Sequence, residues 1–415
     1  MQIADRMARL GTETAFEVLA EVERLKATGK EIISFAVGEP DFDTPRWIRN
    51  AGIDALERGE THYNPSAGIR PLREAIARYI ERTRGVDVDP DEVVVTPGAK
   101  PVIFGAILAC VNPGDEVIYP NPGFPIYESV IAFVGARPVS LPPVEERRFR
   151  FDAQLLRSLI TPRTRMIILN SPHNPTGAML TQEDLKTIAE LANQHDLWVA
   201  SDEIYSRIIY DGAFHSIVSV PGMKERTVLI DGVSKTYAMT GWRLGFGVMN
   251  RELAAGLARI ATNVYSCVAT FTQHAAFAAL EKEEPQREPE AMVAEFKVRR
   301  ELIWEGLNDI PGIRCLKPAG AFYAFPNVTE LCRTLKLSDS GELQRFLLHE
   351  AGVAVLGRNC FGHRDASETG EYIRLSYATS QEQITAGLER MRKAIEAGVP
   401  STSPASTEIQ SRDDS

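Results

Sequence analysis

The chain has 415 residues, which is too long for one compact core and predicts two domains. Apolar residues make up 44% and charged residues 25% of the sequence, a balance that is typical of soluble globular proteins and excludes a disordered or fibrous chain. The net charge of −10 and the lack of a run rich in lysine and arginine exclude the basic surface that a nucleic-acid partner requires.

The sequence carries no sign of export or membrane insertion. The N-terminal stretch lacks an apolar segment ahead of a small-residue cleavage site, and no run of about eighteen apolar residues occurs. The 5 cysteines are scattered and include no Cys-x-x-Cys pair, so neither a zinc site nor a redox pair is predicted. We therefore expect a cytoplasmic protein with no metal site and no membrane partner.

A series of short apolar runs predicts an α/β fold with a mostly parallel central sheet. The runs are rich in β-branched residues and nearly unbroken in apolar character, as in strands that helices cover on both faces. A helical pattern at 181–195 separates two of them. In such sheets ligands bind beyond the carboxyl ends of the strands. The predicted strands are 92–96, 116–119, 166–170, 198–201, 228–231 and 245–249.

A smaller α+β domain is predicted after the sheet. The charged, proline-containing stretch 281–289 indicates a break, and a long amphipathic helix follows at 290–309. Short strands at 321–325, 353–356 and 372–377 and a helix at 381–396 complete this unit. The predicted divisions are an N-terminal segment at 1–45 that joins the small domain, a large domain at 46–289, a small domain at 290–397 and a disordered tail at 398–415.

Lys235 and Arg243 are the first candidates for chemistry. Lys235 follows the predicted strand 228–231, so it is expected at the ligand-facing edge of the sheet. An aldehyde cofactor needs an amine that forms an imine and then carries a proton, and lysine can do both. A phosphate group needs a planar, permanently charged fork, which Arg243 could supply. For either residue alone, a surface lysine or a structural arginine is the commoner interpretation.

Asp202 and Tyr205 strengthen this interpretation. Asp202 follows the predicted strand 198–201. A pyridine ring withdraws electrons well only while its nitrogen is protonated, and a neighbouring carboxylate raises the pKa of that nitrogen. Tyr205 could donate a hydrogen bond to a phenolic oxygen on the same ring. The alternative is that Asp202 simply caps a helix.

Three further positions fit the same ligand. Asn174 lies between two prolines after the strand 166–170, where its amide could bond the phenolic oxygen, although Asn, Pro and Gly also make ordinary turns. Gly98 and Ala99 precede an apolar helix at 102–110, whose free N–H groups would bind phosphate. Phe124 could lie flat on the ring or belong to the core.

Together these motifs resemble those of the class I and II aminotransferases, which are fold-type I pyridoxal-phosphate enzymes, and in particular the prokaryotic aspartate aminotransferases. The resemblance covers residues 36–395. It rests on the order of Gly38-Glu39-Pro40-Asp41-Phe42, Tyr63, Gly68, Leu72-Arg73, Gly98, Asn174-Pro175-Thr176-Gly177, Asp202, Tyr205, Ser234-Lys235, Arg243 and Tyr372-Ile373-Arg374-Leu375-Ser376.

The resemblance implies a role for each matching residue toward pyridoxal phosphate. Lys235 matches the lysine that forms the Schiff base, and Asp202 matches the partner of the ring nitrogen. Asn174 and Tyr205 match the residues that bond the phenolic oxygen, and Phe124 matches the residue that stacks on the ring. The residues that match the phosphate cup are Gly98, Ala99, Lys100, Ser234 and Arg243.

The resemblance also implies partners and a substrate site. Tyr63 matches a tyrosine that reaches the phosphate of a neighbouring subunit, which implies a homodimer with shared active sites. Arg374 matches the arginine that holds the substrate α-carboxylate, with Gly38 and Asn174 beside it. The N-terminal segment 1–45 is then expected to cover the active site, and the large domain to bind the cofactor.

The implied activity is ping-pong transfer of an amino group from an L-amino acid to a 2-keto acid. Lys100 matches a lysine that contacts a distal carboxylate, so aspartate or glutamate is favoured as donor. Glu13 could pair with Lys100 or receive a basic side chain instead. One alternative is a lyase or cyclase acting on a possibly basic amino acid in a specialised pathway. A regulatory protein is not expected, because no basic helix-turn-helix region is attached.

Overall fold

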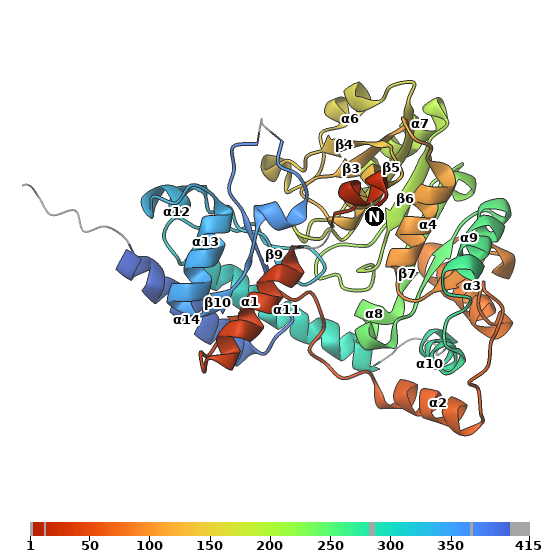
Figure 1. Cartoon of the computed structure of the whole chain (residues 1–415), viewed down its shortest axis with the longest axis horizontal. Coiled ribbons are helices and arrows are strands. Elements are labelled where there is room, and N and C mark those ends of the chain that lie inside the picture. The colour runs from red at the N-terminus through yellow and green to blue at the C-terminus, as the bar shows by residue number, and fades with distance from the viewer. Residues whose placement is uncertain (1–2, 12–13, 282–286, 366–367, 399–415) are drawn as a thin grey trace, which may run out of the picture.

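The computed structural model describes residues 3–11, 14–281, 287–365 and 368–398. It confirms the predicted α/β class, with one large, mostly parallel sheet between helices and a smaller domain beside it (Figure 1). In the part of the chain that is described, none of the helices has both the length and the apolar character needed to span a bilayer.

The central sheet has seven strands in the order β2-β8-β7-β6-β5-β3-β4. β8 is antiparallel to β2 and β7, and all other neighbouring pairs are parallel. The carboxyl ends of β2, β3, β5, β6 and β7 therefore meet at one edge, together with the beginning of β8. The strands are β2 (Val93–Thr96), β3 (Glu116–Pro120), β4 (Arg137–Leu141), β5 (Thr164–Asn170), β6 (Trp198–Asp202), β7 (Thr227–Gly232) and β8 (Gly245–Val248).

All six predicted strands of this sheet are present, with ends within two residues of the prediction. β4 was not predicted, because this edge strand begins with an exposed arginine and a proline and is only partly buried, so it forms no apolar run. Alternate residues of one strand face opposite sides. Val93 and Val95 pack with α3 (Arg70–Arg84) and α10 (Thr270–Glu281), whereas Val94 packs with α4 (Lys100–Cys110) and α9 (Arg251–Val264).

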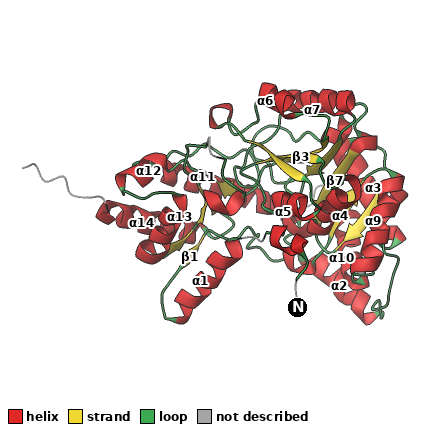
Figure 2. Ribbon diagram, turned by 45° about the horizontal axis from the view of Figure 1, so that its top comes forward, coloured by secondary structure: helices red, strands yellow, loops and turns green. Residues whose placement is uncertain are grey.

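Helices cover both faces of the sheet (Figure 2). The predicted helix at 181–195 is α7, and it begins with a capping box in which Thr181 accepts from the Asp184 backbone and Asp184 accepts from the Thr181 backbone. The helices around the sheet are α2 (Arg46–Glu57), α3 (Arg70–Arg84), α4 (Lys100–Cys110), α5 (Ile126–Phe133), α6 (Ala153–Leu159), α7 (Gln182–His195), α8 (Val233–Thr236), α9 (Arg251–Val264) and α10 (Thr270–Glu281).

The smaller domain contains an antiparallel sheet in the order β11-β12-β9, and β1 near the N-terminus pairs with β10. The predicted break at 281–289 extended too far along the chain, because α11 already begins at Arg287. Pro289 fits within the first turn of this helix. Residues 282–286 and the predicted tail from 399 onward lie outside the described residues. The elements are α1 (Ala15–Ala27), β1 (Ile33–Ser34), α11 (Arg287–Asn308), β9 (Tyr323–Ala324), α12 (Thr329–Thr334), α13 (Ser340–Phe346), β10 (Val353–Ala354), β11 (Leu356–Gly357), β12 (Ile373–Ser376) and α14 (Gln381–Gly398).

A buried ion cluster joins the ends of β6 and β7. Arg84, the last residue of α3, donates from Nε to Glu203 at 3.1 Å and from Nη2 to Asp231 at 2.7 Å. Ser206 accepts a further bond from the same guanidinium at 2.7 Å. The side chains of the three charged residues are 1% exposed. Arg84 therefore neutralises carboxylates that would otherwise be buried without a cation.

Replacing Arg84 by alanine should strongly destabilise the protein. The substitution leaves Glu203 and Asp231 buried without their cation, and breaking a buried pair in this way lowers the free energy of unfolding by about 3–5 kcal/mol. Urea denaturation measures the loss. Arg24→Ala removes an exposed ion pair with Glu21 and should change the stability little. A loss from Arg84→Ala no larger than that of this control would contradict the account.

Candidate active site

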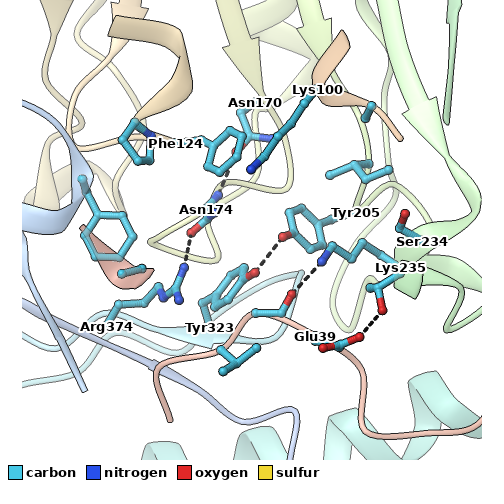
Figure 3. A pocket seen from close by; sticks show the side chains of 18 of the residues that line it. Glu39, Lys100, Phe124, Asn170, Asn174, Tyr205, Ser234, Lys235, Tyr323 and Arg374 are labelled. Carbon is cyan, nitrogen blue, oxygen red and sulfur yellow. Dashed lines mark hydrogen bonds between the residues drawn. The ribbon is translucent and has the colours of Figure 1, made fainter. Parts of the chain in front are cut away.

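A cavity of about 310 Å³ opens at the carboxyl edge of the sheet, within the usual size range of small-molecule sites. Loops after β3, β5, β6 and β7 contribute to its lining, as do the N-terminal segment and residues around β11 and β12. Figure 3 shows the side chains that point into it. The cavity therefore depends on the sheet and on the smaller domain together.

Lys235 lies on α8, directly after β7. Its Nζ donates to the Gly38 carbonyl at 2.6 Å (Figure 3). Burial lowers the pKa of the Lys235 amine to about 8, and the nearby Glu39 carboxylate opposes this shift. An amine with this pKa is partly neutral near physiological pH, which makes it a nucleophile and a proton acceptor.

Asp202 is the last residue of β6 and is buried at the cavity wall. One carboxylate oxygen accepts from the Tyr127 hydroxyl at 2.6 Å, and the other accepts from the Ile204 backbone N–H at 3.2 Å. Burial raises the pKa of Asp202 to about 6, and the Tyr127 hydrogen bond lowers it. These bonds fix the direction of a carboxylate that could pair with a cationic ligand atom.

Arg374 projects from β12 of the smaller domain toward the same cavity. Its Nη1 donates to the Asn174 side-chain oxygen at 3.0 Å, and its Nη2 donates to the Ala36 carbonyl at 2.6 Å. The rings of Tyr323 and Phe361 lie 4.5 and 5.0 Å from the guanidinium carbon. Arg374 lines the cavity, so its guanidinium is placed to bind an anion there, although its buried Nε has no hydrogen-bond partner among the described residues.

Asn170 and Tyr323 hold the residues between Arg374 and the sheet. The Asn170 side chain accepts from the Asn174 backbone N–H at 2.8 Å and donates to the Asp202 carbonyl at 3.0 Å. The hydroxyls of Tyr205 and Tyr323 share a hydrogen bond of 2.7 Å (Figure 3). The side chains that face the cavity are therefore positioned by contacts between strands and between domains.

The other end of the cavity is suited to an anion. Ala99 caps the N-terminus of α4, where the positive end of the helix dipole favours an anion. Arg243 donates from Nη1 to the Thr240 carbonyl at 2.9 Å, and Ser234 lies beside Lys235 on α8. Gly98 adopts φ +91°, and a Cβ there would clash with the Arg243 guanidinium. Glycine is therefore required for the close approach of the loop and the arginine.

The comparisons with known proteins agree with this geometry. The family model described as aminotransferase class I and II matches residues 30–391. The aromatic-amino-acid aminotransferase 2 of Thermococcus litoralis is 40% identical over 88% of this chain and 92% of its own length. The aspartate aminotransferase of Geobacillus stearothermophilus is 37% identical over 96% of this chain and 100% of its own length.

The chain therefore belongs to the class I and II aminotransferase family. The solved structure of the aspartate aminotransferase from Thermus thermophilus with maleate superposes on this aminotransferase with a TM-score of 0.89, at 35% identity, over 95% of this chain and 100% of that chain. The predicted fold type I is confirmed, as is the prediction that the protein is an enzyme that transfers amino groups. The lyase or cyclase alternative is not favoured.

Most of the residues that the sequence singled out in this aminotransferase line one cavity. They are Gly38, Ala99, Lys100, Phe124, Asn174, Asp202, Tyr205, Ser234, Lys235, Arg243 and Arg374. Gly98 lies against Arg243. Tyr63 is 90% exposed and does not line the cavity within one chain. Glu13 lies outside the described residues.

Three residues of the cavity lining were not predicted from the sequence, namely Tyr127, Asn170 and Tyr323. Tyr127 follows Phe124 by three residues, and Asn170 precedes Asn174 by four, so proximity to a recognised motif was the available signal. Tyr323 lies within a short apolar run and resembles an ordinary core residue in the sequence.

Lys235→Met should stabilise the cofactor-free aminotransferase in a pH-dependent way. The pKa of Lys235 is lowered from 10.5 to about 8 by folding, so between these values the unfolded chain binds more protons and the wild-type stability rises with pH. Below pH 8 the variant should gain roughly 3 kcal/mol over the wild type, and the gain should shrink toward pH 10.5.

Urea unfolding of the cofactor-free proteins at several pH values measures this difference. The control is Lys393→Met on α14, whose lysine side chain is 72% exposed, so this substitution should change the stability little. A stability difference for Lys235→Met that stays constant from pH 7 to pH 10.5 would show that burial does not perturb this amine.

Proposed function

We propose that this aminotransferase uses pyridoxal 5'-phosphate and moves an amino group from an L-amino acid to a 2-keto acid, with aspartate or glutamate as the favoured donor. The observation that carries the proposal is that the amine of Lys235, the carboxylate of Asp202 and the guanidinium of Arg374 share one cavity, although they come from three separate elements. A pyridine aldehyde needs an amine for its aldehyde carbon and a carboxylate for its ring nitrogen, and an amino acid needs a cation for its α-carboxylate.

The residues present fit pyridoxal phosphate. The Asp202 carboxylate is held by Tyr127 and would pair with a protonated ring nitrogen. The start of α4 and Arg243 would hold the phosphate, with Ser234 beside them. The residues proposed to complete the site are Gly98, Ala99 and Lys100 at the phosphate, Asn174 and Tyr205 at the phenolic oxygen, and Phe124 against the ring. When bound, the cofactor supplies an aldehyde carbon and an electron-withdrawing ring.

The residues of this chain then have separate tasks. Lys235 is the proton carrier, because its lowered pKa lets the amine take the α-proton from the donor and return it to the acceptor near neutral pH. Arg374 binds the α-carboxylate with the guanidinium that lines the cavity. Tyr323 and Phe361 cover the faces of this guanidinium and exclude water from the contact. Gly38 orients the lysine through its carbonyl.

The substrate preference rests on Lys100. Its Nζ lies 5.3 Å from the centroid of the Phe124 ring and 5.9 Å from that of Phe16, so it brings a positive charge to an otherwise aromatic part of the cavity. A donor with a second carboxylate would be attracted to this charge. The same aromatic surroundings favour an aromatic amino acid as the second candidate, in keeping with the name of the Thermococcus litoralis relative.

We also propose a cytoplasmic homodimer with shared active sites. The 90% exposure of Tyr63 supports this, because such a ring gains most by burial against a second copy. The free cysteines are consistent with a reducing compartment. The pairing of β1 with β10 supports a small domain made of residues 1–45 and 290–397, beside a large domain at 46–289.

Lys235→Ala should abolish transamination. The variant lacks the amine that holds the cofactor and carries the proton, so turnover of aspartate with a 2-keto acid should fall by several orders of magnitude, and the visible absorbance of the lysine-bound cofactor should disappear. Lys393→Ala is the matched control and should keep both properties.

A panel of amino donors tests the substrate assignment in the same assay. Aspartate or glutamate should react with the highest kcat/KM, aromatic donors next, and arginine and ornithine least. Turnover should also require the 2-keto acid acceptor, which a lyase or cyclase would not need. A Lys235→Ala variant that remains active with its visible absorbance intact would contradict the proposed function.

A further inference from the structure

One wall of the active-site cavity belongs to a short 3-10 helix of the smaller domain, η8 (Arg358–Phe361). Cys360 and Phe361 from this helix line the cavity, and Phe361 also lies against Arg374. The loop between β3 and α5 contributes Phe124 from the large domain to the same lining. The room left for a substrate side chain therefore depends on how these two segments are held together.

Arg358 is fully buried at the start of this helix. Its guanidinium forms a two-pronged ion pair with Glu368, from Nε at 2.6 Å and from Nη2 at 2.8 Å. Nη2 also donates to the side-chain oxygen of Asn121 at 3.0 Å, and Nη1 donates to the Gly362 carbonyl at 3.1 Å. Asn121 directly follows β3, so one buried side chain bonds both domains.

Other hydrogen bonds cross the same boundary between the two domains. We call these bonds, together with those of Arg358, the domain latch. Asn121 donates from its amide to the His363 carbonyl at 2.6 Å. The His363 N–H donates to the Glu128 carboxylate at 2.8 Å, and the Gly123 N–H donates to the Phe361 carbonyl at 3.0 Å. Each of these bonds joins η8 or the loop after it to the loop after β3 or to α5.

Gly362 shows how closely the two loops approach. It adopts φ +104°, and a Cβ there would lie 2.8 Å from the Asn121 side-chain oxygen and 3.0 Å from the Glu128 carboxylate. A side chain at this position would therefore push the loops apart. The latch is a close-packed contact in which a small change at Arg358 is transmitted to Phe361.

We propose that Arg358 is a positioning residue that sets the size of donor side chain this aminotransferase accepts. This assignment rests on the proposed function. It adds to the site a residue that contacts neither the cofactor nor the substrate. The rigid guanidinium fork holds Cys360 and Phe361 against the large-domain loop. Without it, Glu368 and Asn121 lose a buried partner, the wall moves outward, and larger side chains fit better.

The test uses Arg358→Met in the full-length enzyme loaded with pyridoxal phosphate. The kcat/KM values for tryptophan and for aspartate are measured under the same conditions, and their ratio is compared with that of the wild type. This ratio does not depend on the fraction of active protein, so a purely structural loss cannot change it. We expect the ratio of tryptophan to aspartate to rise by about fivefold or more. Arg358→Lys keeps the charge without the fork and should give a smaller rise.

Two further variants make the test decisive. Arg390→Met removes an ion pair with Glu31, away from the cavity, and should leave the ratio unchanged. Asn121→Ala removes the large-domain side of the latch but keeps the pair between Arg358 and Glu368, so it should raise the ratio even if Arg358→Met does not fold.

The inference is overturned if the ratio stays within twofold of the wild type, or falls, in Arg358→Met or, where that variant does not fold, in Asn121→Ala, provided that the variant takes up the cofactor and unfolds cooperatively. If the wild-type enzyme transfers amino groups from aspartate but the variants show no change in the ratio, only the proposed role of Arg358 is refuted. A wild-type protein that transfers none from either donor refutes the proposed function itself.

Discussion

The burial of the Lys235 amine beside the Asp202 carboxylate is the constraint on which the rest of the active site depends. Each group is taken out of water, which disfavours its charged form, lowers the pKa of the lysine and raises that of the aspartate. The surroundings compensate by hydrogen bonds from Tyr127 to Asp202 and from Lys235 to the Gly38 carbonyl. A lysine that is easily neutralised and a carboxylate of fixed direction are what amino-group transfer requires.

The sheet provides this arrangement only with the help of the smaller domain. Lys235 follows β7, and Asp202 ends the neighbouring parallel strand β6, so both lie at the edge where the carboxyl ends meet. Arg374 reaches the same cavity from β12, and its bonds to Asn174 and Ala36 tie that strand to the large domain and the N-terminal segment. The side chain proposed to bind the substrate therefore also joins the two domains, so a change at the boundary is expected to alter specificity as well as stability.

The sequence predicted the central sheet and the residues that follow its strands well, because continuous apolar runs mark buried strands and polar residues at their ends stand out. Lys235, Asp202 and Asn174 were found in this way. Tyr127 and Tyr323 were not, because they act through partners 75 and 118 residues away, and nothing local separates them from core tyrosines. Arg358 was missed for the same reason, since its contacts with Asn121 and Glu368 exist only after both domains have folded.

The most direct test of the central claim is to find which residue carries the cofactor. The purified protein is incubated with pyridoxal phosphate, reduced with borohydride, digested and analysed by peptide mass spectrometry. The account predicts one pyridoxyl group per chain, on the peptide that contains Lys235, in a protein that absorbs visible light before reduction. Modification of a different lysine, or a colourless protein that takes up no cofactor, would contradict it.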